Sequence, residues 1–157
     1  MTKNDHLSQH VNVLMLDDKD HLLSQFEVFF EIAGYTFRGF KTTREFESFL
    51  PNASYDLLIM DLAVDHRSKG YDLVKGLVYG PLKVCPDAIV VHSAHSHKKD
   101  KEDEFSKDDA ISLGMTVILK PINDPGRKAI LEKLAARISI REGGESGHSE
   151  GEGGIDE

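Results

Sequence analysis

Three aspartates in this sequence follow apolar runs and are candidates for binding a cation. Asp17 and Asp18 come directly after the run 11–16, and Asp61 comes directly after "YDLLIM". Like charges at the rim of a core are costly unless a cation lies between them. Carboxylate oxygens suit a hard cation, and Mg²⁺ typically takes one or two carboxylates together with waters and phosphate oxygens. The three aspartates therefore predict a Mg²⁺ site if the fold brings them together.

A serine and a lysine at the ends of two other apolar runs extend this prediction to phosphoryl transfer. Ser93 ends "DAIVVHS", and Lys120 follows "MTVIL". A metaphosphate-like transition state spreads its charge over three equatorial oxygens, which a metal ion, an ammonium and a hydroxyl can each contact. A carboxylate can itself be the nucleophile and form an acyl phosphate. Asp61 lies between the other groups along the chain and is the expected nucleophile.

The elements that must position these residues alternate between strand and helix. Apolar or aromatic runs predict five strands, at 11–16, 35–40, 55–61, 87–93 and 115–121. Helical spacing predicts helices at 20–33, 42–50, 70–79, in a charged segment that ends near Gly114, and at 127–140. Gly34 is expected to end the first helix, and Thr42 with Glu45 to begin the second as a capping box. This alternation predicts an α/β fold with a parallel sheet, in which the carboxyl ends of the strands meet at one crevice.

In this order, each at the end of a strand, these residues resemble the receiver domain of bacterial response regulators. The resemblance covers about residues 11–140 and implies a doubly wound (βα)5 flavodoxin-like parallel sheet, with strand order 2-1-3-4-5 and helices on both faces. It implies that Asp61 is a phosphoacceptor, supplied by a sensor histidine kinase or a phosphotransfer protein, and that Mg²⁺ is required. The protein would then be no enzyme in the usual sense, since it would catalyse only its own phosphorylation and dephosphorylation.

The resemblance also implies roles for the neighbours of Asp61. Asp18 would bind the metal directly and Asp17 would help, while Asp61 and the backbone carbonyl of Ala63 would complete the protein's share of the ligands. Ser93 and Lys120 would report phosphorylation to a downstream protein target. The position of the family's switch aromatic, three residues before the lysine, holds Val117 here.

Two segments depart from the family's pattern. The loop "DLAVDHRSKGYDL" lacks the usual proline, and the small Ala63 would leave Asp61 more open to water. The segment between Ser93 and Lys120 is longer than usual and includes the charge run 98–109, which is expected to be a solvated helix face or a partner surface.

Two other function classes stay open beside the phosphorylated switch. The altered loop and Val117 favour a receiver-like interaction module that works without phosphorylation. A Mg²⁺-dependent phosphatase is disfavoured, because Ala63 stands where that class usually has a second catalytic aspartate. A zinc site is also disfavoured, because loop histidines rarely provide the fixed geometry that it needs; the histidines concerned are His66, His92, His95 and His97.

Composition places the chain among ordinary globular proteins and limits its partners. The 157 residues carry a formal net charge of −8 and a single cysteine, Cys85, which is expected to be a small packing residue in a reducing cytoplasm. An acidic chain without a basic stripe argues against direct nucleic-acid binding, and no run is long enough to span a membrane. A homodimer is compatible with the sequence.

Residues 1–10 are expected to be flexible, and residues 141–157, with six glycines and six acidic residues, to be a disordered tail or linker.

Overall fold

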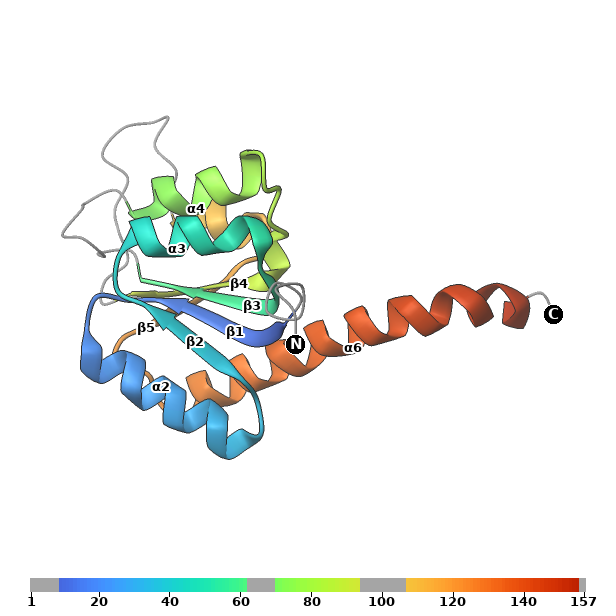
Figure 1. Cartoon of the computed structure of the whole chain (residues 1–157), viewed down its shortest axis with the longest axis horizontal. Coiled ribbons are helices and arrows are strands. Elements are labelled where there is room, and N and C mark those ends of the chain that lie inside the picture. Colours follow the sequence, from blue (N-terminus) through green and yellow to red (C-terminus); the bar gives the residue numbers. More distant parts are fainter. Residues whose placement is uncertain (1–8, 62–69, 94–106, 156–157) are drawn as a thin grey trace.

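The computed structural model describes residues 9–61, 70–93 and 107–155, in which strands and helices alternate (Figure 1). The strands are β1 (His10–Leu16), β2 (Phe37–Phe40), β3 (Ser54–Met60), β4 (Ile89–Ser93) and β5 (Thr116–Leu119). The helices are α2 (Asp20–Ala33), α3 (Thr43–Phe49), α4 (Gly70–Tyr79), α5 (Lys107–Ser112) and α6 (Asp124–Ile155). Short 3-10 helices at Leu50–Asn52 and Pro86–Ala88 lead into β3 and β4.

All five strands pair in parallel in the order β2-β1-β3-β4-β5, which confirms the predicted topology. Helices α3 and α4 cover one face of the sheet, and α2 and the first part of α6 cover the other (Figure 1). Alternate residues of a strand point to opposite faces, so one apolar strand supplies both layers. In β1, Leu14 and Leu16 pack toward α3 and α4, and Val13 and Met15 pack toward α2 and α6.

Two local predictions of helix ends are confirmed. Gly34 ends α2 in the left-handed conformation, with φ at +93°, where a side chain on Cβ would be strained. Thr42 begins α3, and its hydroxyl accepts the backbone N–H of Glu45 at 3.2 Å. These two caps fix the ends of the helices on either side of β2.

Several strands are shorter than their apolar runs, for identifiable reasons. β2 begins at Phe37 because the side chain of Asn12 accepts the backbone N–H of Thr36 at 2.9 Å, where a strand ladder would otherwise start. The Pro86–Ala88 helix takes the start of the fourth run, so β4 begins at Ile89. β1 is one residue longer than predicted and includes His10, which the predicted flexible N-terminus had contained.

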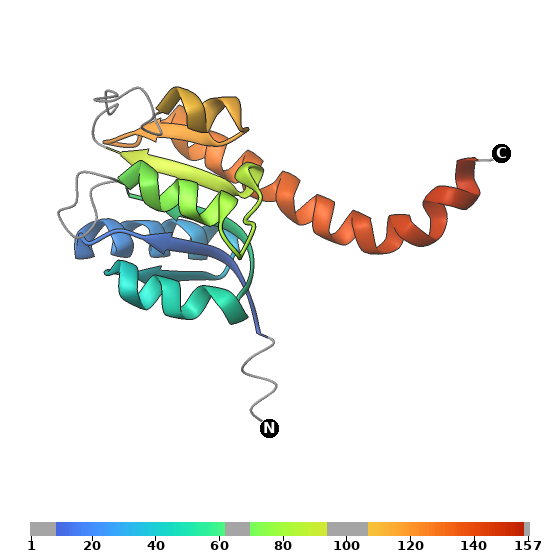
Figure 2. The ribbon, with the colours of Figure 1, turned by 90° about the horizontal axis from the view of Figure 1, so that it is seen from above.

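The C-terminal helix differs most from the prediction. α6 starts at Asp124, since Asn123 caps it by accepting the backbone N–H of Gly126 at 2.8 Å. It continues through Ile155, so the prediction of a helix that ends near residue 140 was wrong (Figure 2). The composition of the tail indicated only that it lacks a face to bury. A helix that is already nucleated and packed can add one hydrogen bond for each further residue without a new nucleus.

The cysteine prediction was also wrong, because Cys85 is exposed. It precedes the Pro86–Ala88 helix, and its sulfur accepts a long contact of 3.9 Å from the Arg137 guanidinium. Among the helices of the described residues, none combines the length and the apolar character needed to cross a membrane.

Candidate functional site

The three aspartates lie together at the carboxyl edge of the sheet. Each of the two buried ones is held there by its own backbone. The N–H of Asp17 donates to the carbonyl of Phe40 at 3.0 Å, and that of Asp61 to the carbonyl of Leu16 at 2.9 Å. Carboxylate oxygens of Asp17, Asp18 and Asp61 all lie within 4.8 Å of one another, which confirms the predicted grouping.

Burial makes this grouping unusual. Asp17 is fully buried and Asp61 is 3% exposed, whereas Asp18 is only partly buried. Ionised carboxylates are rarely removed from water without a cation or several hydrogen bonds to offset the loss of hydration. The site therefore needs positive charge close by.

One lysine supplies part of that charge. The Lys120 Nζ atom lies 3.2 Å from Asp17 Oδ2 and 3.3 Å from Asp61 Oδ1, so a single ammonium bridges two buried carboxylates. Its backbone N–H donates to the carbonyl of Ser93 at 2.7 Å, which links the ends of β4 and β5 directly beside the site. At the rim, the more exposed Lys19 pairs with Asp18 at 3.4 Å.

The charge balance of the cluster stays negative. Burial raises the pKa of the Asp17 carboxyl above its usual value; the N–H of Lys19, at 2.9 Å, opposes the rise, the nearby Asp61 carboxylate adds to it, and Lys120 opposes it. A raised pKa means that the folded protein disfavours the ionised form of Asp17. Three carboxylates with one bridging ammonium are thus suited to a divalent cation that would relieve this repulsion.

Comparison with known proteins identifies the fold. No family model matches the sequence, and no curated protein sequence matches it. Solved structures do match. A putative response regulator from Chloroflexus aurantiacus has 21% identity and a TM-score of 0.61, over 82% of this chain and 99% of its own. A CheY-like response regulator receiver domain from Methylobacillus flagellatus has 20% identity and a TM-score of 0.60, over 80% and 99%. The beryllofluoride-activated NtrC4 receiver domain dimer has 20% identity and a TM-score of 0.61, over 80% and 98%.

This chain has the receiver-domain fold. The strand order and the five alternating helices agree with that fold, and the identities near 20% support a likeness of structure alone. Within the receiver fold, the acidic residues and Lys120 stand at the ends of β1, β3 and β5, as the sequence resemblance implied.

The other predicted site residues have different outcomes. Ser93 ends β4 and is buried, beside Lys120 in the backbone. Val117 is half-buried and packs with the core under α3 and α4, where no aromatic switch is present at its position. Ala63 lies outside the described residues, as do His66, His95, His97 and most of the charge run 98–109.

Two features of this receiver fold were missed by the sequence analysis. His92 falls in the predicted strand 87–93 but was considered only among histidines that could bind zinc; it lies in β4 and is 1% exposed. Asp56, near the amino ends of the strands, is buried in β3, and its carboxylate accepts hydrogen bonds from three side chains. It accepts from His10 at 2.7 Å, from Asn12 at 3.0 Å and from Arg141 at 2.7 Å. A titratable side chain inside an otherwise apolar strand was the available signal for both.

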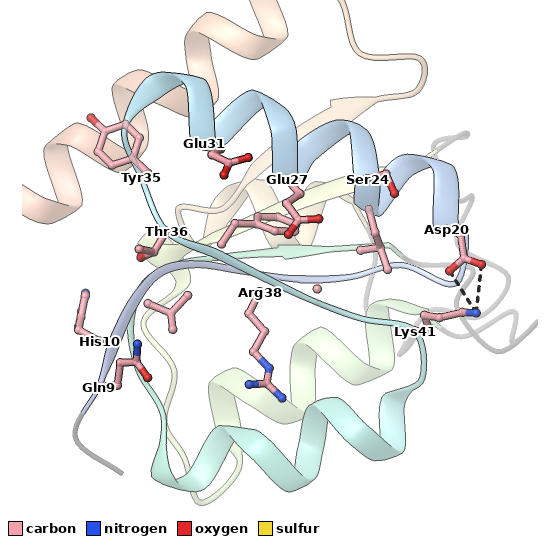
Figure 3. Close-up of a pocket in the computed structure, with 14 residues that line it drawn as sticks. Gln9, His10, Asp20, Ser24, Glu27, Glu31, Tyr35, Thr36, Arg38 and Lys41 are labelled. Atoms are coloured by element: carbon pink, nitrogen blue, oxygen red, sulfur yellow. Dashed lines mark hydrogen bonds and ion pairs between the residues drawn. The ribbon is translucent and has the colours of Figure 1, made fainter. Parts of the chain in front are cut away.

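A groove lies beside β2 (Figure 3). It has a volume of about 770 Å³ and runs between α2 and β2. The ion pair of Asp20 and Lys41, 3.1 Å long, lies at one end of it. Asp17, Asp18 and Asp61 do not line this groove, so it does not contribute to the candidate site.

Proposed function

We propose that this protein is a two-component response-regulator receiver that accepts a phosphoryl group on Asp61. The observation that carries the proposal is the Lys120 ammonium, which bridges Asp17 and Asp61 beside a third carboxylate. The receiver fold supports the same function.

The proposed reaction is a transfer between two covalent carriers. A carboxylate oxygen of Asp61 attacks phosphorus and forms a P–O bond, while the P–N bond of a phosphohistidine breaks and its electron pair stays on the imidazole of the donor. Lys120 already contacts Asp61, so its ammonium is placed to contact an oxygen of the incoming phosphoryl group. The Ser93 hydroxyl is the proposed contact for another oxygen.

The residues present fit Mg²⁺. Their oxygen donors are carboxylates, which a hard cation prefers, and the excess negative charge of the cluster is what a divalent cation would balance. Asp18, Asp17 and Asp61 would hold the ion, with the carbonyl of Ala63 as a further proposed ligand. When bound, Mg²⁺ supplies charge stabilisation for the phosphoryl oxygens.

We infer that the output is a change in protein contacts. The backbone link between Lys120 and Ser93 gives movement at the site a direct route into β4 and β5. The proposed donor is a sensor histidine kinase or a phosphotransfer protein, and the protein turns over no separate substrate. NtrC4 provides an example of an activated receiver in a dimer; a homodimer of this chain is a proposed output by analogy.

Intact mass spectrometry after incubation with acetyl phosphate tests the proposal. We expect one added phosphoryl group on the native protein in the presence of Mg²⁺, and none after removal of Mg²⁺ with EDTA. The variant Asp61→Asn should gain none, whereas the matched control Asp20→Asn, an exposed aspartate paired with Lys41, should be modified as the native protein is. Equal modification of the native protein and Asp61→Asn would reject the assignment.

The second candidate is a receiver-like interaction module that works without phosphorylation. Val117, in place of a switch aromatic, is the observation that favours it. This candidate predicts no adduct with acetyl phosphate and no Mg²⁺-dependent binding of beryllofluoride.

A further inference from the structure

The buried histidine of β4 lies beside the proposed phosphoacceptor. Met60 of β3 is in register with Val91 of β4, so the next residues of the two strands, Asp61 and His92, are neighbours across the sheet. His92 points to the α2 face, where its ring packs edge-on against Phe26 with centroids 5.2 Å apart. Asp61 follows Ile59, which packs on that same face, by the alternation of the strand.

His92 is buried without a hydrogen bond to any residue that the structure describes. Neither Nδ1 nor Nε2 has a partner among the residues that the structure describes, although the side chain is almost fully buried. Most buried polar side chains have at least one partner, so an imidazole with two unused nitrogens requires an explanation.

Lys120 is the charged group that acts on this imidazole. Burial, and then the positive charge of Lys120, lower the pKa of His92 to about 4. The ring is therefore neutral at physiological pH, with one N–H donor and one nitrogen that accepts. An ammonium has three donors and no acceptor, and two of those of Lys120 are directed to Asp17 and Asp61.

We propose that His92 is a positioning residue for Lys120. Its unprotonated ring nitrogen accepts a hydrogen bond from the Lys120 ammonium when that ammonium turns from Asp61 to a phosphoryl oxygen. This inference rests on the proposed function. Phosphorylation turns the Asp61 carboxylate into an acyl phosphate, whose remaining carbonyl oxygen carries no full charge and is a weaker partner for Lys120. The free nitrogen of His92 then provides a neutral acceptor on the same side of the sheet. It orients the ammonium without competing for it as a second carboxylate would.

The test measures the rate constant for phosphorylation by acetyl phosphate in Mg²⁺ for two substitutions of similar size. His92→Leu removes both nitrogens, and His92→Gln keeps an acceptor oxygen. We expect His92→Leu to react about five- to tenfold more slowly, which is the effect of losing one hydrogen bond in the transition state. His92→Gln should stay within about threefold of the native rate for the same reason.

A double-mutant cycle with Lys120→Ala separates positioning from packing. If His92 acts through Lys120, His92→Leu should cause no further slowing in the Lys120→Ala background. Urea denaturation provides the structural control: His92→Leu should be at least as stable as the native protein, because it removes an imidazole that makes no hydrogen bond within the described part of the chain.

The possible outcomes distinguish this inference from the proposed function. Native-like rates for His92→Leu, or equal slowing for Leu and Gln, would overturn the role of His92 and leave Asp61 as the phosphoacceptor. An additive effect of His92→Leu and Lys120→Ala would also overturn it. Failure of the native protein to react at all would reject both proposals.

Discussion

Buried aspartates lie at both ends of β3, but their surroundings differ. At the carboxyl edge, Asp61 and Asp17 share one bridging ammonium, and burial raises the pKa of Asp17. Near the amino edge, burial alone would raise the pKa of Asp56, but hydrogen bonds from Arg141, His10 and Asn12 together lower it. One edge therefore has too little positive charge for its carboxylates, and the other has enough.

The difference separates a structural charge from a charge in the candidate site. Asp56 ties β3 to β1 through His10 and Asn12, and to α6 through Arg141, so its ionised form stabilises the folded protein. Asp17 is destabilised as an anion by the same fold that buries it. A buried carboxylate kept in an unfavourable state is typical of sites that bind or react with a ligand.

The largest effect on stability should come from removing Asp56, the buried carboxylate near the amino edge. Asp56→Ala removes a buried carboxylate that pairs with the partly buried His10 and with Arg141, and we expect a loss of about 3 to 4 kcal/mol in the free energy of unfolding. Urea denaturation at neutral pH measures it.

The matched control is Asp87→Ala, which removes another carboxylate that holds α6. Asp87 pairs with Lys133 and, at 3.1 Å, with Arg137, but its side chain is 43% exposed. Exposed pairs contribute little, so we expect a loss of about 1 kcal/mol. A similar loss in both variants would mean that the burial of Asp56 does not matter, and the comparison of the two edges would fail.

An effect of intermediate size should appear on acidification. The pKa of His92 is about 4 in the folded protein and 6.5 when the imidazole is fully solvated, so the unfolded chain binds more protons between these values. Stability should therefore fall as the pH drops from 7 to 4, by on the order of 3 kcal/mol. Denaturant titrations at several pH values measure this slope, and His92→Leu should flatten it.

The aspartates of the two edges contribute differently to the pH dependence of stability between pH 7 and 4. The lowered pKa of Asp56 means that its contribution is lost only below the ordinary aspartate value of 3.8, outside the range. The raised pKa of Asp17 acts in the opposite direction to His92, because the folded protein takes up that proton more readily as the pH falls. His92→Leu should thus become slightly more stable toward pH 4, and a slope equal to that of the native protein would contradict the assignment to His92.

The sequence could predict the carboxyl edge but not the amino edge. Asp17, Asp61 and Lys120 follow apolar runs, and parallel strands bring their carboxyl ends together whatever the details of packing. Asp56 and Arg141 are 85 residues apart and meet only because α6 continues past residue 140. Neither strand periodicity nor composition encodes that crossing. The composition of residues 141–157 gave no indication that the helix continues past residue 140.

The partners of His92 could not be predicted for a related reason. Its place in an apolar run indicated a strand, but the side to which it points depends on the register of β3 and β4. A shift of one residue would have moved His92 to the opposite face, away from Phe26.

The smallest effect on stability should come from removing one buried charge at the carboxyl edge. Asp17→Asn keeps the shape of the side chain and removes one charge from the cluster, so we expect a gain of about 1 kcal/mol in stability at neutral pH without Mg²⁺. Thermal unfolding with and without millimolar Mg²⁺ sharpens the result. Mg²⁺ should raise the melting temperature of the native protein and raise that of Asp17→Asn much less, because a ligand that binds only the folded state stabilises it. Asp20→Asn, next to the cluster but exposed, should respond to Mg²⁺ as the native protein does. If Asp17→Asn were instead less stable than the native protein, Lys120 would already balance the cluster, and the two edges would not differ in the way that their charges indicate.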